Sequence, residues 1–189
     1  MNNQQVYQEE MDNCVYDWLA SHLTTGNDLK TVEWVKETLR QQRVTTFLLV
    51  WPIMERDCFD RNLNVRSVRA FSQNHANLYP IINNDNTIDC MLMHFHNRFG
   101  GLNNQKFSLL AGDRPIPTKI HHFFTSSDSL PNSDDNLKLH VMLYVTERYR
   151  NNIFHGNKLF ESWTSVSDEL DYCITFMMRL IDAYCTRDG

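Results

Sequence analysis

The residues with the clearest chemical potential lie together in one short segment, 147–156, which reads ERYRNNIFHG. In a helix, this segment would bring two guanidinium groups, two amides and an imidazole within about two to three turns. Arg150 can bind and neutralise phosphate oxygens, and His155 can move a proton near neutral pH. No metal-ligand pattern accompanies them. The combination therefore favours chemistry on a phosphate group.

The segment is predicted to end a helix that covers 135–155. Gly156 is well placed as a left-handed C-cap, and Lys158 lies close to the negative end of the helix dipole. Between 138 and 158 the charged residues are four cations and one anion, Glu147. A local basic surface is therefore expected here, although the whole chain carries a net charge of −5.

Helical periodicity dominates the rest of the chain, and alternating strand patterning is scarce, which predicts an all-α domain. The other predicted helices cover 5–23, a region from about 28 towards Phe59 with a kink near Pro52, 67–78, 87–99, and a last helix from Ser165. Pro80 and the loop 83–86 are expected to separate the helices 67–78 and 87–99. The interval 100–136 is expected to be a long irregular surface loop with short helical pieces.

The last predicted helix carries an apolar stripe with alternating spacings of four and three residues. Its members are Val166, Leu170, Cys173, Met177, Leu180 and Tyr184. Core packing is the preferred interpretation of this stripe, and a coiled-coil seam is the alternative. Cys173 and Cys185 on the same helix are expected to be buried, inert thiols.

Length and composition predict one domain, or one domain with a short N-terminal extension. The chain has 189 residues, of which 42% are hydrophobic, enough for a sizeable core. Its five cysteines form no C-x-x-C pair, which indicates reduced thiols. No signal peptide or membrane-spanning apolar run is visible, so a soluble, cytoplasmic protein without membrane attachment is expected.

The spacing of Arg and His alone is a weak signal, because the chain repeats it. Arg69 precedes His75, and Arg114 precedes His121, at similar distances. Prolines interrupt the second pair, and neither pair has Asn after the Arg or Gly after the His. Only the pair Arg150 and His155 has both of these neighbouring residues and lies at the end of a long predicted helix.

With those neighbours, the segment RNNIFHG at 150–156 resembles the R-N-x-x-x-H motif of the HEPN superfamily of ribonucleases. The Phe-His-Gly ending is most similar to the Apea-like branch. The resemblance covers the motif closely and the helical remainder loosely, and it implies a HEPN-like domain over 28–189 with an N-terminal extension over 1–27. The resemblance implies an all-α bundle that dimerises, so that two motifs share one composite cleft. It further implies cleavage of RNA without a metal or cofactor, often in toxin–antitoxin or phage-defence systems with an antitoxin or regulatory partner.

The resemblance also implies roles for individual residues. Arg150 and His155 would be the catalytic pair, with Asn151 as the polar residue beside them. His155 would exchange protons with the ribose 2′-OH or the leaving 5′-oxygen, and Arg150 would stabilise the charge of the transition state. Arg148, Asn152 and Lys158 are candidates for binding the substrate. Asn157 stands where some HEPN toxins carry a Tyr that a partner modifies, which argues against that mode of silencing.

Helical geometry adds an expectation about assembly. Asn151, Asn152 and His155 share a face with Arg148, whereas Arg150 lies about 140° away from His155. Arg150 would therefore reach around the helix end or act with His155 of a second copy. The alternative reading is a non-catalytic helical module that binds RNA or a protein, with His155 only stabilising the helix C-terminus.

Other polar groups are weaker candidates for function. His94 and His96 lie about 200° apart on a helix and would not converge on one metal ion, so no metal ligands are assigned. Tryptophans are interpreted as core or interface anchors, and the cations after Pro52 as a solvated face, with an RNA groove as the alternative. These cations are Arg56, Arg61, Arg66 and Arg69.

Overall fold

The computed structural model describes residues 31, 42–101, 104–126, 133–154 and 167–186. These residues contain eight α-helices and one short 3₁₀ helix, and no strand occurs among them. The all-α prediction is therefore confirmed. The predicted N-terminal extension, 1–27, lies outside the described residues.

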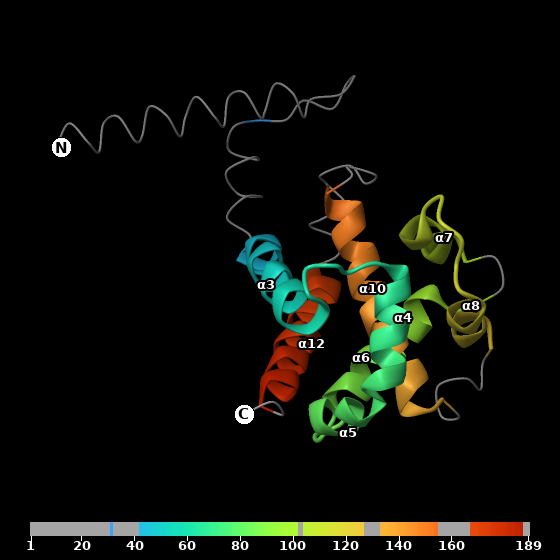
Figure 1. Ribbon diagram of the computed structural model, residues 1–189. Coiled ribbons are helices and arrows are strands. Elements are labelled where there is room, and N and C mark those ends of the chain that lie inside the picture. The colour runs from blue at the N-terminus through green and yellow to red at the C-terminus, as the bar shows by residue number, and fades with distance from the viewer. Residues whose placement is uncertain (1–30, 32–41, 102–103, 127–132, 155–166, 187–189) are drawn as a thin grey trace.

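Helix α10 (Asp135–Phe154) is the centre of the fold. Every residue from Leu139 to Tyr149 is buried. In Figure 1 the other helices surround it, and α10 contacts α4 (Val65–Asn74), α12 (Ser167–Cys185) and α7 (Gln105–Ala111), among others. The residues 139–145 are all apolar except His140, and such an all-round apolar run is stable only inside a protein, which explains the central position. The predicted bounds of this helix are confirmed as far as Phe154.

Helices α3 (Gln42–Phe59) and α12 pack along each other on one flank of α10 (Figure 1). Pro52 lies inside α3 at an exposed position, so α3 continues past the proline. The apolar stripe of α12 is core: its members at 170, 173, 177 and 180 are buried, and Tyr184 is half-buried against the core. Cys173 is buried as predicted, but Cys185 is exposed in the last turn, so that prediction is wrong.

Three helical pieces connect α3 to the next long helix. They are α4, a 3₁₀ turn over Ala76–Leu78, and α5 (Tyr79–Ile82). Asn64 caps α4 by accepting the N–H groups of Arg66 and Ser67, and the Ser67 hydroxyl accepts the Asn64 N–H. Pro80 was expected to separate helices, but it lies within α5, at a first-turn position where no N–H is needed. Helix α6 then covers Thr87–Phe99, as predicted.

The interval 100–136 contains short helical pieces, as expected, but they are not confined to the surface. It holds two helices, α7 and α8 (Thr118–Thr125), and both bury apolar side chains against the core. The buried residues are Phe107, Leu110 and Ala111 in α7, and Ile120, Phe123 and Phe124 in α8. Pro115 and Pro117 lie between the two helices, so these prolines interrupt only the connection and not the whole interval. The short apolar clusters outweigh the polar residues around them because they complete the core.

Within the described residues, no helix combines the length and the apolar character that crossing a membrane requires.

Candidate functional site

Only part of the predicted motif lies within the described residues, at the end of α10. Arg148, Arg150, Asn151 and Asn152 lie in the last two turns of the described helix. His155, Gly156 and Lys158 lie outside the described residues. The structure therefore describes the arginine and asparagine side chains of the candidate site.

A buried ion pair forms the base of this region. The Glu147 and Arg148 side chains are only 5% and 4% exposed, and Arg148 Nε lies 3.0 Å from Glu147 Oε2. The Arg148 Nη1 group also donates to the main-chain carbonyl of Ala111 at 3.2 Å. Charged groups so deeply buried are retained only when they are paired and hydrogen-bonded. The sequence had identified Arg148 as a candidate for binding substrate, and the structure gives it an internal partner.

Asn151 links this ion pair to Arg150. Its amide Nδ2 donates to Glu147 Oε1, one helical turn back, and its Oδ1 accepts from Arg150 Nη1 at 3.0 Å. A carboxylate only accepts hydrogen bonds and a guanidinium only donates them, so the two neighbours fix which way the amide points. Asn151 is buried, and the side chain of Arg150 is thereby held by a residue that cannot rotate freely.

Arg150 also contacts the neighbouring helix α3. Its Cζ atom lies 5.6 Å from the centroid of the Trp51 ring, a cation–π geometry. Trp51 is buried, stacks on Phe47, and donates its indole N–H to Glu55 at 3.2 Å. Arg150 itself is half-buried, so it lies at the edge of the core and keeps access to solvent.

The other amide of the motif, Asn152, anchors α7. Asn152 is buried, and its Nδ2 donates to the main-chain carbonyl of Leu110 at 3.3 Å. Together with Arg148 and Ala111, this contact satisfies two carbonyls near the end of α7. Arg148 and Asn152 therefore both have structural roles, while a role for either in binding substrate stays a prediction.

A second cation approaches from outside the helix. Arg114, in the segment after α7, places Nη1 3.6 Å from Glu147 Oε1, and its side chain is 53% exposed. Glu147 is thus surrounded by Arg148, Asn151 and Arg114. Sequence reasoning noted Glu147 only as the single anion of a basic stretch. Its spacing of four from Asn151 was the available signal, whereas nothing in the sequence indicated Arg114.

Tyr149 is a poor candidate for acid–base chemistry despite its position beside Arg150. The side chain is buried, and this burial raises the pKa of the phenol above its usual value. The phenol therefore remains protonated near neutral pH. Among the described residues, Arg150 is the motif side chain that combines a charge with partial exposure.

The two histidines of α6 have separate partners. His94 Nε2 lies 3.3 Å from Glu169 Oε1, and His96 Nε2 lies 3.1 Å from the Ser126 carbonyl oxygen. In the part of the chain that the structure describes, no group of three or more His, Cys, Asp or Glu residues is arranged to hold a metal ion.

Comparison of the chain with known protein families, with curated proteins and with solved structures finds no match. The likeness to the HEPN superfamily thus rests on the motif at 150–156 and stays a prediction.

Proposed function

We propose that this protein is a metal-independent endoribonuclease whose active site is centred on Arg150 and His155. The observation that carries the proposal is the chain of contacts from Glu147 through Asn151 to Arg150. A surface arginine that only aids solubility needs no buried amide to orient it. An arginine that must meet a phosphate in one geometry gains from such preorganisation.

The proposed reaction is transphosphorylation within the RNA backbone. His155 removes the proton from a ribose 2′-OH, and the 2′-oxygen attacks the adjacent phosphorus. The bond to the 5′-oxygen of the next nucleotide breaks, and that oxygen receives a proton from a histidine or from water. Arg150 stabilises the negative charge on the phosphorus-bound oxygens. The products are a 2′,3′-cyclic phosphate and a 5′-OH, and DNA is not a substrate because it lacks the nucleophile.

The remaining candidates have supporting roles in this proposal. Asn151 is a positioning residue for Arg150, and Arg148 and Asn152 keep the helix end fixed on α7. Lys158 and the exposed Arg114 are the cations available to neighbouring phosphates. Arg148, Asn151 and Asn152 are held by contacts with the protein itself, and the proposal assigns no cofactor.

The active form in this proposal is a homodimer with a composite site. Arg150 and His155 point about 140° apart on an ideal helix, so a pairing between two copies is easier than a pairing within one. Mixing inactive Arg150→Ala and His155→Ala proteins tests this assembly. Random exchange in a two-fold dimer should restore roughly a quarter of the wild-type activity if each site takes one residue from each copy. No restoration after verified subunit exchange contradicts the composite site.

The proposal is tested by RNA cleavage in the presence of EDTA. Wild type should cleave, and Arg150→Ala and His155→Ala should each lose at least a hundredfold in rate, the usual size of such contributions. Arg66→Ala is the matched control, because Arg66 is an exposed arginine on α4 and should leave the rate unchanged. Cleavage by His155→Ala at the wild-type rate contradicts the assignment of His155.

A biological setting follows from the same resemblance. A cytoplasmic toxin or phage-defence effector, held inactive by an antitoxin or regulatory partner, would arrest growth when expressed alone. Arg150→Ala should relieve that arrest at equal protein levels. An equal arrest by wild type and variant contradicts the toxin proposal.

The second candidate is a non-catalytic helical module that binds RNA or a protein partner. The burial of Arg148, Asn151 and Asn152 favours it, because their polar groups bond to the protein itself. Retained RNA binding without cleavage, by wild type and by His155→Ala alike, distinguishes this module from the enzyme.

A further inference from the structure

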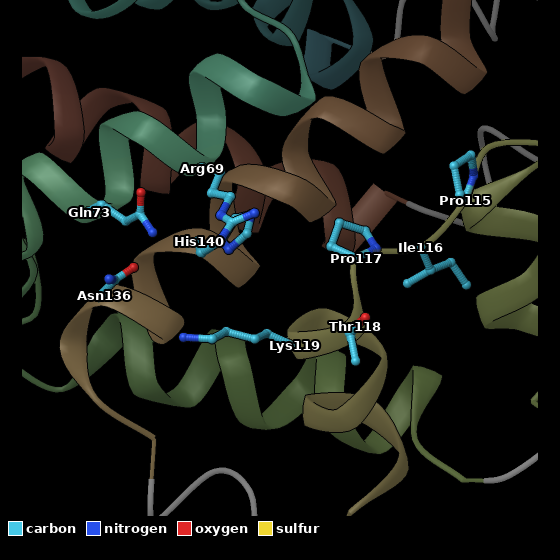
Figure 2. Close-up of a pocket in the computed structure, with 9 residues that line it drawn as sticks. All are labelled: Arg69, Gln73, Pro115, Ile116, Pro117, Thr118, Lys119, Asn136 and His140. Carbon is cyan, nitrogen blue, oxygen red and sulfur yellow. The ribbon is translucent and has the colours of Figure 1, made fainter.

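A pocket of about 440 Å³ lies at the opposite end of α10 from the motif. Figure 2 shows its polar side chains reaching in from three helices: Arg69 and Gln73 from α4, Lys119 from α8, and Asn136 and His140 from α10. The volume is in the range of small-molecule sites. His140 precedes Arg150 by ten residues, which separates the pocket from the motif by about 15 Å along the helix.

The pocket is electropositive. No acidic residue lines it, whereas Arg69 and Lys119 both do. Neither cation forms an ion pair with a carboxylate among the residues that the structure describes. Two cations that converge on one hollow without an anion favour a negatively charged ligand.

His140 gives a second, independent indication of a ligand. The residue is only 5% exposed, and its Nε2 atom is buried without a hydrogen-bond partner in the described structure. Buried polar atoms are rarely left in this state, so each one needs an explanation. Burial, together with the nearby charges of Arg69 and Lys119, lowers the pKa of His140 to about 4, so the ring is neutral at pH 7.

The N-terminus of α8 completes the polar side. Pro117 occupies the N-cap position and no side chain caps this end, although Thr118 and Lys119 of its first turn line the pocket. The N–H groups of an uncapped first turn bind anions, and the helix dipole adds to the attraction. Pro115, Ile116 and Pro117, which directly precede this helix, form the apolar part of the lining (Figure 2).

From this arrangement we infer that the pocket binds a small phosphomonoester. The phosphate group lies between Arg69, Lys119 and the α8 N-terminus, and the organic part lies against the wall formed by Pro115, Ile116 and Pro117. A phosphomonoester carries about −1.5 to −2 charges at pH 7, which matches two cations better than one carboxylate does. Gln73 and Asn136 supply amides for hydroxyl or ring polar groups, and the volume admits a molecule of about mononucleotide size.

The inference is tested by calorimetric titration of the whole protein with 5′-AMP and glycerol 3-phosphate. Adenosine and glycerol are the matched compounds without the charge, and inorganic phosphate is the matched anion without the organic part. At least one phosphomonoester should bind at least tenfold more tightly than both of its matched compounds. Arg69→Gln and Lys119→Gln should each weaken that binding at least tenfold. Both residues are exposed, so neither change disturbs the core.

Two control variants locate the binding. Arg66→Gln removes an exposed arginine one turn before Arg69 on α4, and Arg150→Ala removes the cation of the proposed RNA site; both should bind as wild type does. Binding that is lost in Arg150→Ala, or that Arg69→Gln and Lys119→Gln leave unchanged, overturns the inference. So does equal affinity for inorganic phosphate, or no binding of either phosphomonoester at millimolar concentration. None of these results depends on whether the protein cleaves RNA.

Discussion

Removing the negative charge of Glu147 should destabilise the protein strongly, because this carboxylate offsets the cost of burying the Arg148 guanidinium. The two groups are 3.0 Å apart and almost fully buried. At an effective dielectric constant of about 20, this separation corresponds to about 5 kcal/mol of attraction. Removing one partner of such a pair usually costs about 3–5 kcal/mol. Glu147→Gln keeps the shape and an oxygen for Asn151, so the loss reports mainly on the charge.

The assay is urea unfolding followed by circular dichroism, supported by thermal melts. Glu147→Gln should lower the free energy of unfolding by about 3–5 kcal/mol, or the melting temperature by about 6–20 °C. Glu147→Gln combined with Arg148→Met should recover much of this loss, because no unpaired charge then stays buried.

An exposed ion pair provides the matched control. Arg43 Nε and Asp171 Oδ2 are even closer, at 2.7 Å, but their side chains are 48% and 43% exposed. Asp171→Asn should therefore cost less than about 1 kcal/mol. If Glu147→Gln lowers the free energy of unfolding no more than Asp171→Asn does, burial is not what makes the Glu147–Arg148 pair important for stability.

Three further predictions concern other parts of the fold. Burial lowers the pKa of His140 from its ordinary value of 6.5 to about 4, so protonation of its ring favours the unfolded state. The free energy of unfolding should therefore fall by about 3 kcal/mol between pH 6.5 and 4. A His140→Leu variant, unfolded in urea across that range, should have a correspondingly shallower dependence, and an equal slope would contradict this origin. Gly100→Ala should cost about 1–3 kcal/mol in urea unfolding, because the added Cβ would lie 2.4 Å from the His96 carbonyl oxygen; an unchanged midpoint would show that the backbone yields freely. Asn64→Ala should cost about 1 kcal/mol by removing the cap of α4, and Asn64→Asp, which keeps the accepting oxygen, should largely restore it; equal losses would argue against the cap.

The long helices were predictable from sequence because their cues are local. The bounds of α6 follow from apolar periodicity, and the extent of α10 to Phe154 follows from a long run without Pro or Gly. The packing of helices α7 and α8 against the core was not predicted, since each helix is short and has only three or four apolar residues to indicate it. Their stability comes from burial against distant segments, which a local pattern does not contain.

The candidate site was predictable only in part for a similar reason. Arg150 and Asn151 could be selected by motif, but their link to Glu147 depends on which side of α10 faces α7. Trp51 and Arg114 join the region from helix α3 and from the segment after α7, far away in sequence. The phosphate pocket was missed altogether, because Arg69, Lys119 and His140 come from three separate helices and form no motif.

The most direct test of the central claim is to identify the ends of the RNA fragments that the wild-type protein produces in EDTA. The proposal predicts 2′,3′-cyclic phosphate and 5′-OH ends, no cleavage of RNA methylated at the 2′-oxygens, and loss of these products in His155→Ala. Fragments with 3′-OH and 5′-phosphate ends, or cleavage of the methylated RNA, would contradict it.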